Sequence, residues 1–482
     1  MKYLDLVRDV SQYNMFKKDV IKVVSLGLLS SLLLVGCGEA KKTADTQSAK
    51  TEIVKLDSIS TNDFKNHIGD KNYIYVDTRN DSYYNGFRED GEKNGGHIKG
   101  AIQYTADWIG KVNKDKLAKF VEDKGIEKDK KIVVYDSNPE NVSKVGSMLK
   151  KLGYNVFAYD KFGEYANESD AKLEKFKRYD QLLNPKIVKD LIDGKNPETL
   201  KNKDYMIFEV SWGPLDKAKD YKDGHIKGSY HFNTDWIENG PDWNISKPDV
   251  VKKNLEAAGI DKNKTVILYS NDQSAPFRVM FALKWAGVKD VRVLNGGLYA
   301  WKEAGYDLET KVNEPKKVAD FGVKIPANPS IDIATPKEAY NMMKKDGLKL
   351  ISIRSWKEHE GKTSGYDYIP KAGEPKGAVW GFAGSDAGHM QDYYDPDHTL
   401  RNPLEMVKLW KEQGIKEHDK GAFYCGTGWR AAVPWEMTQM LGLDSFVVYD
   451  GGWNMWQMDN SLPEQKSLSN DVKEPNSKND WE

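Results

Sequence analysis

The feature that most constrains this chain is an internal repeat. A short apolar strand that ends in Tyr occurs three times, at Tyr135, Tyr269 and Tyr424. A Gly that closes a helical stretch follows each Tyr at the same distance (135 to 153, 269 to 287 and 424 to 442), and another apolar strand comes next. Because chance spacing would rarely hold three times, we predict three copies of one structural unit.

The residues upstream in each copy also share a pattern. An apolar strand is followed by a Gly-His-Ile-Lys-Gly turn at 96–100 and 224–228, and by the looser sequence Glu-Pro-Lys-Gly-Ala at 374–378. Strands that alternate with helices and are joined by short turns containing Gly indicate a parallel sheet. We therefore predict an α/β fold in which each unit is a parallel sheet with helices on both faces.

The length of the chain agrees with three units. A chain of 482 residues is too long for one hydrophobic core and suits about three domains. We place the domains at residues 53–178, 179–315 and 325–465, with a linker that contains Pro between the second and the third. Residues 466–482 are polar and charged, and we predict that this tail is disordered.

The N-terminal segment predicts export and a lipid anchor. Three Lys precede an apolar run at 23–35, and this run is shorter than the roughly 20 residues that span a bilayer. The run ends in Leu-Val-Gly-Cys, which resembles a bacterial lipobox and marks Cys37 as the lipidation site. We expect residues 1–36 to be removed as a signal peptide, for which Met15 is the more natural start. Residues 37–52 would then tether the domains to the outer side of a bacterial membrane, at the cell surface or on the periplasmic side.

Charge and cysteine content narrow the function classes. Lys and Arg (72) nearly balance Asp and Glu (73), so no long-range positive field attracts nucleic acid. Cys37 and Cys425 are the two cysteines of the chain. If Cys37 carries lipid, Cys425 has no partner for an internal disulfide and remains a free thiol.

Cys425 opens a loop of sequence Cys-Gly-Thr-Gly-Trp-Arg between an apolar strand and a predicted helix near residues 431–441. Two Gly allow the backbone to curl, so that several N–H groups at the helix N-terminus point inward and bind an anion. Such surroundings favour the ionised thiol. Arg430 adds a fixed positive charge that suits sulfite or carboxylate oxygens. We assign substrate binding to the loop residues Gly426, Thr427, Gly428, Trp429 and Arg430.

Several motifs resemble those of the rhodanese family. They are Asp-Thr-Arg at 77–79, the Gly-His-Ile turns, Asp-Gly-Gly-Trp at 450–453 and the Cys425 loop, which is similar to the active-site loop of that family. The resemblance covers almost all of residues 53–465. The form with three units looks like the three-domain periplasmic thiosulfate sulfurtransferases, so the resemblance implies three tandem rhodanese-like domains.

The resemblance also implies sulfur transfer through a persulfide on Cys425. The Cys425 thiolate would attack the outer sulfur of a small anionic donor, and a thiol or cyanide would accept that sulfur. Thiosulfate is the preferred donor. 3-Mercaptopyruvate is the alternative, because the Gly-Thr-Gly interior of the loop resembles mercaptopyruvate enzymes. A lipoprotein that binds a sulfur species without catalysis is a third hypothesis. We predict no metal and no cofactor.

The length of the loop and the other repeats bear on this prediction. Four residues separate Cys425 from Arg430, whereas phosphatases that use Cys have five residues between the Cys and the Arg of their phosphate-binding loop. The shorter loop therefore favours sulfur transfer over phosphoryl transfer. Asp136 and Ser270 stand at the position of Cys425 in the first and second repeats. Neither side chain can form a persulfide, so we expect the first two domains to be inactive and to serve as scaffold and cleft wall.

Three further residues are candidates for the donor site. Arg354 stands at the position of Arg79, and it either contacts the donor anion or forms a structural ion pair. Ser385 and Trp236 could line a cleft between domains, although core packing is the more frequent role of a Trp.

Overall fold

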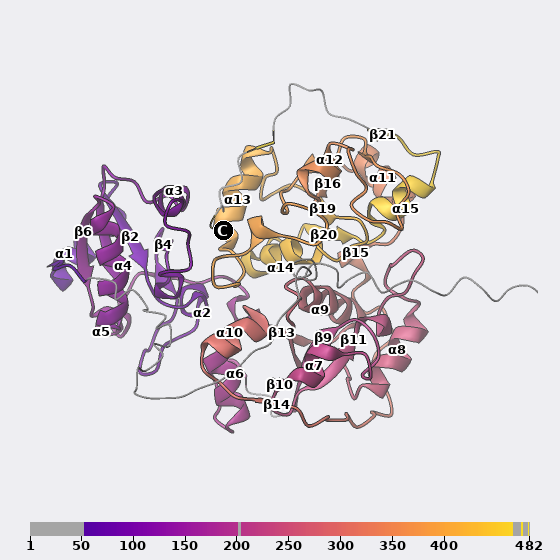
Figure 1. Cartoon of the computed structure of the whole chain (residues 1–482), viewed down its shortest axis with the longest axis horizontal. Coiled ribbons are helices and arrows are strands. Elements are labelled where there is room, and N and C mark those ends of the chain that lie inside the picture. The colour runs from indigo at the N-terminus through magenta and orange to yellow at the C-terminus, as the bar shows by residue number, and fades with distance from the viewer. Residues whose placement is uncertain (1–52, 201–203, 466–473, 476–480, 482) are drawn as a thin grey trace, which may run out of the picture. The chain divides into compact units, whose positions relative to one another are not determined.

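Each predicted domain contains one five-stranded parallel sheet (Figure 1). The computed structural model describes residues 53–200, 204–465, 474–475 and 481. The predicted signal peptide, the tether and the lipidation site Cys37 lie outside the described residues. In the part of the chain that is described, no helix combines the length and the apolar character needed to cross a membrane.

The three sheets have the same topology. Read from its first strand, each sheet has the order first, fifth, fourth, second and third strand along the chain, and all neighbouring strands are parallel. The first sheet contains β1 (Asp57–Ser58), β2 (Tyr73–Asp77), β4 (Ile102–Gln103), β5 (Lys131–Tyr135) and β6 (Asn155–Tyr159). The second contains β8 (Leu182–Leu183), β9 (Tyr205–Ser211), β11 (Tyr230–Asn233), β12 (Thr265–Tyr269) and β13 (Asp290–Leu294). The third contains β15 (Asp332–Ile333), β16 (Lys349–Ser352), β18 (Val379–Trp380), β19 (Gly421–Tyr424) and β20 (Phe446–Tyr449).

Helices connect these strands and cover the sheets. The first domain has α1 (Thr61–Asn66), α2 (Asp81–Asn85), α3 (Leu117–Asp123), α4 (Pro139–Lys151) and α5 (Phe162–Ala166). The second has α6 (Pro185–Ile192), α7 (Lys219–Asp223), α8 (Pro248–Ala257), α9 (Ala275–Ala286) and α10 (Gly297–Glu303). The third has α11 (Pro336–Lys345), α12 (Trp356–His359), α13 (Pro403–Glu412), α14 (Ala432–Leu441) and α15 (Gly452–Met458).

The Gly-His-Ile turns and their counterpart in the third domain each form a short antiparallel pair outside the main sheet. These pairs are β3 (His97–Ile98) with β7 (Leu173–Glu174), β10 (His225–Ile226) with β14 (Leu308–Glu309), and β17 (Glu374–Pro375) with β21 (Glu464–Gln465). The predicted α/β fold of three repeated units is therefore confirmed.

Both faces of each sheet are buried, as the apolar character of the central strands predicts. Ile132 and Val134 of β5 face one hydrophobic core, and the alternate residues Val133 and Tyr135 face another. The same alternation holds in β12 and in β19. The core that contains Val133 also holds residues of the second and third domains, so the three domains share one apolar interior.

The helices that follow the Ser270 and Cys425 loops pack against each other (Figure 1). Almost all side chains of α9 and α14 are buried, and the rings of Phe281 and Trp435 meet edge to face at 5.0 Å. Because α9 and α14 start at equivalent loops, this contact brings the second domain close to the loop that contains Cys425.

The predicted disorder of the tail does not extend to Trp481. The indole of Trp481 donates a hydrogen bond to the Tyr394 carbonyl oxygen at 3.2 Å. The Trp481 carbonyl oxygen accepts the Asn113 backbone N–H at 3.1 Å. A large aromatic side chain in a polar tail can bury apolar area without any local periodicity, which explains why the sequence pattern gave no sign of this contact.

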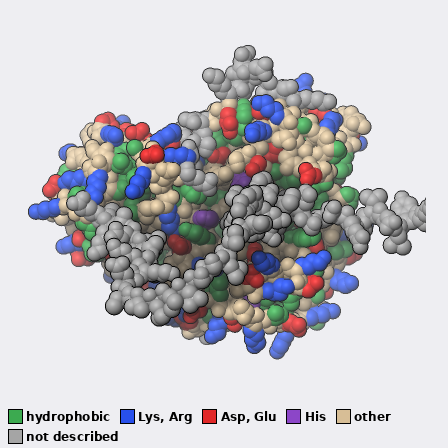
Figure 2. All heavy atoms as spheres, in the orientation of Figure 1, with side chains coloured by type: hydrophobic (Ala, Val, Ile, Leu, Met, Phe, Trp, Pro, Cys, Tyr) green, Lys and Arg blue, Asp and Glu red, His purple; other side chains and the backbone are tan. Residues whose placement is uncertain are grey.

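The charged surface in view agrees with the near balance of the two signs. Figure 2 shows Lys and Arg side chains interspersed with Asp and Glu over the described part of this face.

Candidate active site

Cys425 lies directly after β19 and has no exposed surface. The Asp-Gly-Gly-Trp turn at 450–453 holds the loop from behind. The backbone N–H groups of Trp453 and Asn454 donate hydrogen bonds to the carbonyl oxygens of Cys425 (2.9 Å) and Gly426 (3.0 Å). Gly452 has φ +54°, and a Cβ atom there would lie 2.8 Å from the Cys425 carbonyl oxygen. Gly at this position is therefore required for the close approach of turn and loop.

The backbone amides of the loop are unoccupied. None of the N–H groups from Gly426 to Ala431 donates a hydrogen bond to any residue that the structure describes. Gly428 adopts the left-handed region at φ +87°, which curls the loop. Buried N–H groups without a partner are rare in proteins, and a run of them before a helix is typical of an anion-binding loop. The role of residues 426–430 in substrate binding stays a prediction.

Arg430 is buried beside this loop and is paired with a carboxylate. Its two terminal nitrogens donate to Glu358 at 3.0 and 2.9 Å, and one of them also donates to the Tyr366 hydroxyl at 3.2 Å. Burial would raise the pKa of Glu358, but Arg430 and Arg354 outweigh it and lower that pKa to about 2. The Nε atom of Arg430 is buried and has no partner among the described residues, so it is available to a bound anion.

Arg354 forms a structural ion pair, which is the second of the two alternatives that the sequence left open. Its guanidinium bonds Glu374, Glu358 (3.3 Å) and the Gly373 carbonyl oxygen (2.7 Å), and it has no exposed surface. Arg79 likewise donates to the Gly96 carbonyl oxygen at 2.7 Å in the first domain. These contacts favour the structural role of Arg354, because protein acceptors bind its guanidinium; a contact with the donor stays a prediction.

The buried carboxylate that pairs with the Arg comes from a different position in the third domain than in the first. In the first domain Asp77 pairs with Arg79 and accepts the Tyr135 hydroxyl at 2.8 Å. Ser352 replaces this Asp in the third domain, and Glu374 on the neighbouring turn accepts the Tyr424 hydroxyl at 2.6 Å. The charge is kept although the motif is lost.

The structure places Ser385 near the site and the half-buried Trp236 at the edge of a hydrophobic core. Ser385 is exposed, in a loop whose Asp386 carbonyl oxygen lies 3.5 Å from an Arg430 nitrogen. The Trp236 ring packs against Phe232 at 4.9 Å within the second domain. Core packing, the more frequent role of a Trp, therefore describes Trp236.

Several site residues were not predicted from the sequence. Glu358 and Tyr366 contact Arg430, and Glu238 of the second domain accepts the indole N–H of Trp429. A local signal existed for Glu358, because the Ser-x-x-Glu spacing from Ser355 predicts a helix capping box, which is present. Tyr366 and Glu238 come from irregular segments without a comparable signal.

In the first domain the equivalent loop is filled by its own side chains. Asp136 stands at the position of Cys425, and its carboxylate accepts the backbone N–H of Asn138 at 2.8 Å. The Thr78 hydroxyl (2.8 Å) and the Asn141 amide (3.0 Å) donate to the same carboxylate. A bound anion would meet a negative charge here.

In the second domain Ser270 and Asp272 take the corresponding places. The Ser270 hydroxyl donates to the Val210 carbonyl oxygen at 2.6 Å and accepts the Asp272 N–H at 2.9 Å. The Asp272 carboxylate accepts the N–H groups of Ser274 (2.7 Å) and Ala275 (3.0 Å) at the start of α9. These amides are therefore satisfied without a ligand.

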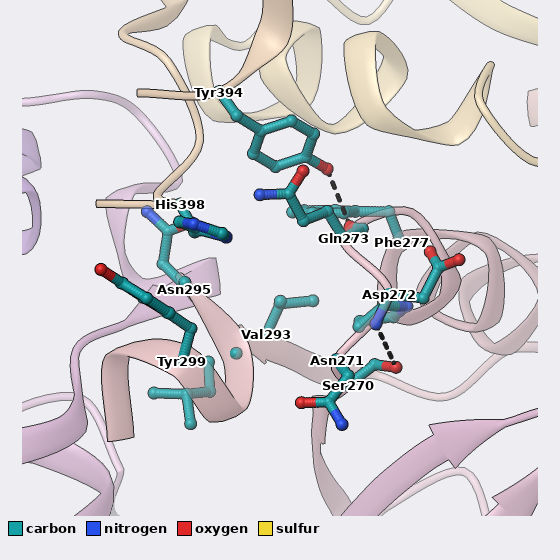
Figure 3. A pocket seen from close by; sticks show the side chains of 14 residues that line it. Ser270, Asn271, Asp272, Gln273, Phe277, Val293, Asn295, Tyr299, Tyr394 and His398 are labelled. Atoms are coloured by element: carbon teal, nitrogen blue, oxygen red, sulfur yellow. Dashed lines mark hydrogen bonds between the residues drawn. The ribbon is translucent and has the colours of Figure 1, made fainter. Parts of the chain in front are cut away.

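A small pocket lies over the Ser270 loop rather than at Cys425 (Figure 3). Figure 3 shows Tyr394 and His398 of the third domain pointing toward it, with the Tyr394 hydroxyl bonded to the Gln273 carbonyl oxygen at 2.8 Å. Its volume is about 30 Å³, and roughly 10–15 Å³ of such volume holds one water molecule. The pocket thus suits water rather than a sulfur donor, and it lacks a thiol.

Comparisons with known proteins identify the repeated unit. The model of the rhodanese-like domain matches residues 60–162, 184–304 and 335–459, which together make up more than half of the chain. Thiosulfate sulfurtransferase YnjE from Escherichia coli (strain K12) is 36% identical over 390 residues, which cover 80% of this chain and 88% of that protein. Thiosulfate/3-mercaptopyruvate sulfurtransferase 1 from Arabidopsis thaliana is 24% identical and matches 55% of this chain and 74% of that protein.

Solved structures extend the comparison to the whole three-domain arrangement. A variant of EanB in complex with ergothioneine has a TM-score of 0.81 at 32% identity, and the match covers 86% of this chain and 100% of that one. An anaerobic ergothioneine biosynthesis enzyme from Chlorobium limicola, in complex with trimethyl histidine, has a TM-score of 0.80 with the same identity and coverage. The three matched domains and the extent of these similarities show that the chain belongs to the rhodanese family of sulfurtransferases.

Proposed function

We propose that the protein transfers sulfur from thiosulfate to a thiol or cyanide through a persulfide on Cys425. The observation that carries this proposal is the run of unoccupied backbone amides from Gly426 to Ala431 directly after the thiol. Thiosulfate, the departing sulfite and a persulfide are all anions, and inward-facing amides at a helix N-terminus favour an anion.

The proposed reaction has two balanced steps. The Cys425 thiolate attacks the outer sulfur of thiosulfate, a new S–S bond forms at Sγ, and the electron pair of the broken S–S bond leaves with sulfite. Cyanide or a thiolate then attacks the outer sulfur of the persulfide, and the electron pair returns to Cys425 Sγ. In this scheme the amides and the free Arg430 Nε–H stabilise the anions, while Glu358 holds the Arg430 side chain in place.

Steady-state kinetics with two donors test this proposal. The protein is incubated with cyanide and either thiosulfate or 3-mercaptopyruvate, and the formation of thiocyanate is measured. We expect the larger kcat/KM with thiosulfate. A larger value with 3-mercaptopyruvate would favour that donor, and the absence of turnover with both would favour a protein that only binds sulfur species.

A second candidate function concerns the acceptor. The rings of Tyr366, Tyr368 and Trp243 form a row, with centroids 5.3 and 6.1 Å apart, and the Tyr366 ring packs on Gly426 of the Cys425 loop. Aromatic faces attract quaternary ammonium groups. The similarity to an enzyme with trimethyl histidine bound therefore favours such an acceptor as the alternative. Mass spectrometry for ergothioneine, after incubation of the persulfide form with trimethyl histidine, separates the two candidates.

We also propose that the protein is a lipoprotein on the outer side of a bacterial membrane, anchored at Cys37. The apolar run at 23–35 and the Leu-Val-Gly-Cys sequence that ends it support this proposal. Mass spectrometry of the N-terminal peptide after expression in a bacterium should find lipid on Cys37. An intact N-terminus in the soluble fraction, or unchanged membrane attachment of Cys37→Ala, would contradict it.

A further inference from the structure

A loop of the second domain contacts the part of the third domain that holds Cys425. This bridging loop consists of residues 238–245 and comes shortly after β11. Three of its contacts reach the third domain through backbone or amide groups. The Ile245 N–H donates to Asp450 at 2.7 Å, the Pro241 carbonyl oxygen accepts the Asn454 side chain at 3.1 Å, and the Asn244 side chain donates to the Ala334 carbonyl oxygen at 3.0 Å.

Two of these partners lie in the turn that holds the Cys425 loop or directly after it. Asp450 begins the Asp-Gly-Gly-Trp turn, and the Asn454 backbone N–H donates to the Gly426 carbonyl oxygen at 3.0 Å. The bridging loop therefore fixes the turn from one side, while the turn fixes the carbonyl oxygens of the Cys425 loop from the other. When these carbonyl oxygens are held, the peptide planes that carry the neighbouring N–H groups are held as well.

A direct contact joins the bridging loop to the Cys425 loop. The indole N–H of Trp429 donates to one oxygen of the Glu238 carboxylate. The other oxygen of Glu238 accepts Arg278 Nε at 2.7 Å, and Arg278 Nη1 donates to Asp450 at 2.6 Å. Trp429, Glu238, Arg278 and Asp450 thus form one chain of hydrogen bonds that runs from the third domain through the second and back.

The members of this chain leave little room for movement. Glu238, Arg278 and Asp450 are each about 1% exposed or less. A Cβ atom on Gly428 would lie 2.6 Å from an Asp450 oxygen and 3.0 Å from Arg278 Nη1. Burial raises the pKa of Glu238 to about 7 although Arg278 opposes this rise, so the carboxylate depends on Arg278 to stay charged. The charged network therefore packs directly against the left-handed residue of the loop.

We propose that the second domain positions the Cys425 loop, with Glu238 and Arg278 as positioning residues that act through Trp429 and Asp450. Their role is to keep the loop amides directed at the thiol and at a bound anion. The second domain is then a functional part of the site, although its own loop lacks a thiol. This inference rests on the proposed function of Cys425, and it adds the second domain to the machinery of that site.

Variants of the full chain test the proposal. Glu238→Gln removes the charge at nearly constant shape, and Trp429→Phe keeps the aromatic ring but removes the indole N–H. The pH dependence of Cys425 alkylation by iodoacetamide is followed by peptide mass spectrometry, which needs no sulfur donor. We expect the alkylation profile of each variant to move to higher pH by about one unit, because misdirected amides stabilise the thiolate less. The kcat/KM with thiosulfate should fall about tenfold in each variant.

The double variant and a matched control distinguish positioning from general weakening of the domain interface. Glu238→Gln combined with Trp429→Phe should be less impaired than the sum of the two single variants, because both interrupt the same chain, one at the Glu238–Arg278 pair and the other at the Trp429–Glu238 hydrogen bond. Glu436→Gln is the control: Glu436 is buried on α14 and pairs with Lys284 of the second domain at 3.2 Å, away from the loop. It should leave the pH dependence of Cys425 alkylation unchanged, and kcat/KM should stay within about twofold of the unchanged protein.

The outcomes separate this inference from the proposed function. Shifted alkylation profiles in a protein without thiosulfate activity would support the positioning role and refute thiosulfate as donor. Unchanged profiles in both single variants, a shift of equal size in Glu436→Gln, or independent effects in the double variant would each overturn the inference. If Glu238→Gln unfolds, as thermal denaturation would reveal, the Trp429→Phe profile decides alone.

Discussion

The loops of the second and third domains have equivalent positions in the fold, but they differ in whether side chains accept hydrogen bonds from their backbone N–H groups. In the second domain Ser270 and Asp272 accept the N–H groups that precede α9. In the third domain the N–H groups from Gly426 to Ala431 have no acceptor among the described residues. The loop of the second domain thus satisfies three of its N–H groups with its own side chains, whereas the described residues supply no acceptor for the six N–H groups from Gly426 to Ala431.

The carboxylates show the same difference. Asp136 and Asp272 lie inside the loops of the first two domains, where they would repel an anion. The third domain keeps Glu358 on another element, bonded to Arg430, so that no carboxylate enters the loop itself. The third-domain loop therefore presents a thiol and no carboxylate.

The largest effect is expected from removal of the thiol. Cys425→Ser should reduce sulfur transfer to background, because a hydroxyl cannot form a persulfide. Thiocyanate formation with thiosulfate measures this, and thermal denaturation should show that the fold is kept. Transfer by the Ser variant well above background would mean that Cys425 is not the sulfur carrier.

Replacement of Glu358 should lower the stability of the protein. Glu358→Gln leaves Arg354 and Arg430 without their shared buried anion and should cost about 3–5 kcal/mol of unfolding free energy at neutral pH. The pKa of Glu358 is lowered from 4.5 to about 2, so its stabilising contribution is full above pH 4.5 and is lost as the pH falls toward 2. Urea denaturation at several pH values measures this, and a difference between the two proteins that stays constant down to pH 3 would contradict it.

Arg430→Ala should weaken the donor site itself. A charge-assisted hydrogen bond is worth roughly 1.5–3 kcal/mol, so kcat/KM with thiosulfate should fall about 10- to 100-fold. Arg430→Lys should recover part of the loss, since a point charge replaces the flat guanidinium group. Equal kinetics for Arg430→Ala and the unchanged protein would leave anion binding to the backbone amides alone.

Gly428→Ala should distort the Cys425 loop. Gly428 has φ +87°, which costs other residues about 1–2 kcal/mol, and a Cβ atom would lie 2.6 Å from Asp450. We expect the kcat/KM with thiosulfate to fall about tenfold. The matched control is Gly414→Ala, which also has a positive φ but no neighbouring atom within reach of a Cβ, and it should change stability only.

The smallest effect on activity is expected from the loop of the second domain. Ser270→Ala removes hydrogen bonds to Val210 and Asp272 and should cost about 1 kcal/mol of stability. Because this loop has no thiol, kcat/KM with thiosulfate should stay within about twofold of the unchanged protein. A large loss of activity at constant stability would show that the second loop takes part in the reaction.

Periodic features of the molecule could be predicted from the sequence, and contacts between distant segments could not. Equal spacing from Tyr135, Tyr269 and Tyr424 predicted three parallel sheets, because each apolar strand must bury both faces. The loop of Cys425 was predicted for a similar reason, since Gly, Cys and Arg act there over a few adjacent residues. The hydrogen bonds from Arg278 to Glu238 and to Asp450 join residues that are far apart in sequence, and no local sequence pattern predicts such contacts.

The ion pair of Arg354 could not be predicted from the sequence, because its carboxylate partner comes from a different position than in the first domain. Arg354 keeps the position of Arg79, which suggested a contact with the donor. Its partner Glu374 lies on the turn rather than at the position of Asp77, so the structural ion pair was not visible in the motif. Residues that compensate each other across a fold are recognised only when both are seen in space.

Mass spectrometry of the protein after incubation with thiosulfate tests whether Cys425 carries the transferred sulfur. We predict that the mass of the unchanged protein rises by one sulfur atom, that peptide fragmentation locates this atom on Cys425, and that cyanide removes it as thiocyanate. Cys425→Ser should show no such increase under the same conditions. The absence of added sulfur in the unchanged protein, or its presence in the Cys425→Ser variant, would contradict the assignment of Cys425 as the sulfur carrier.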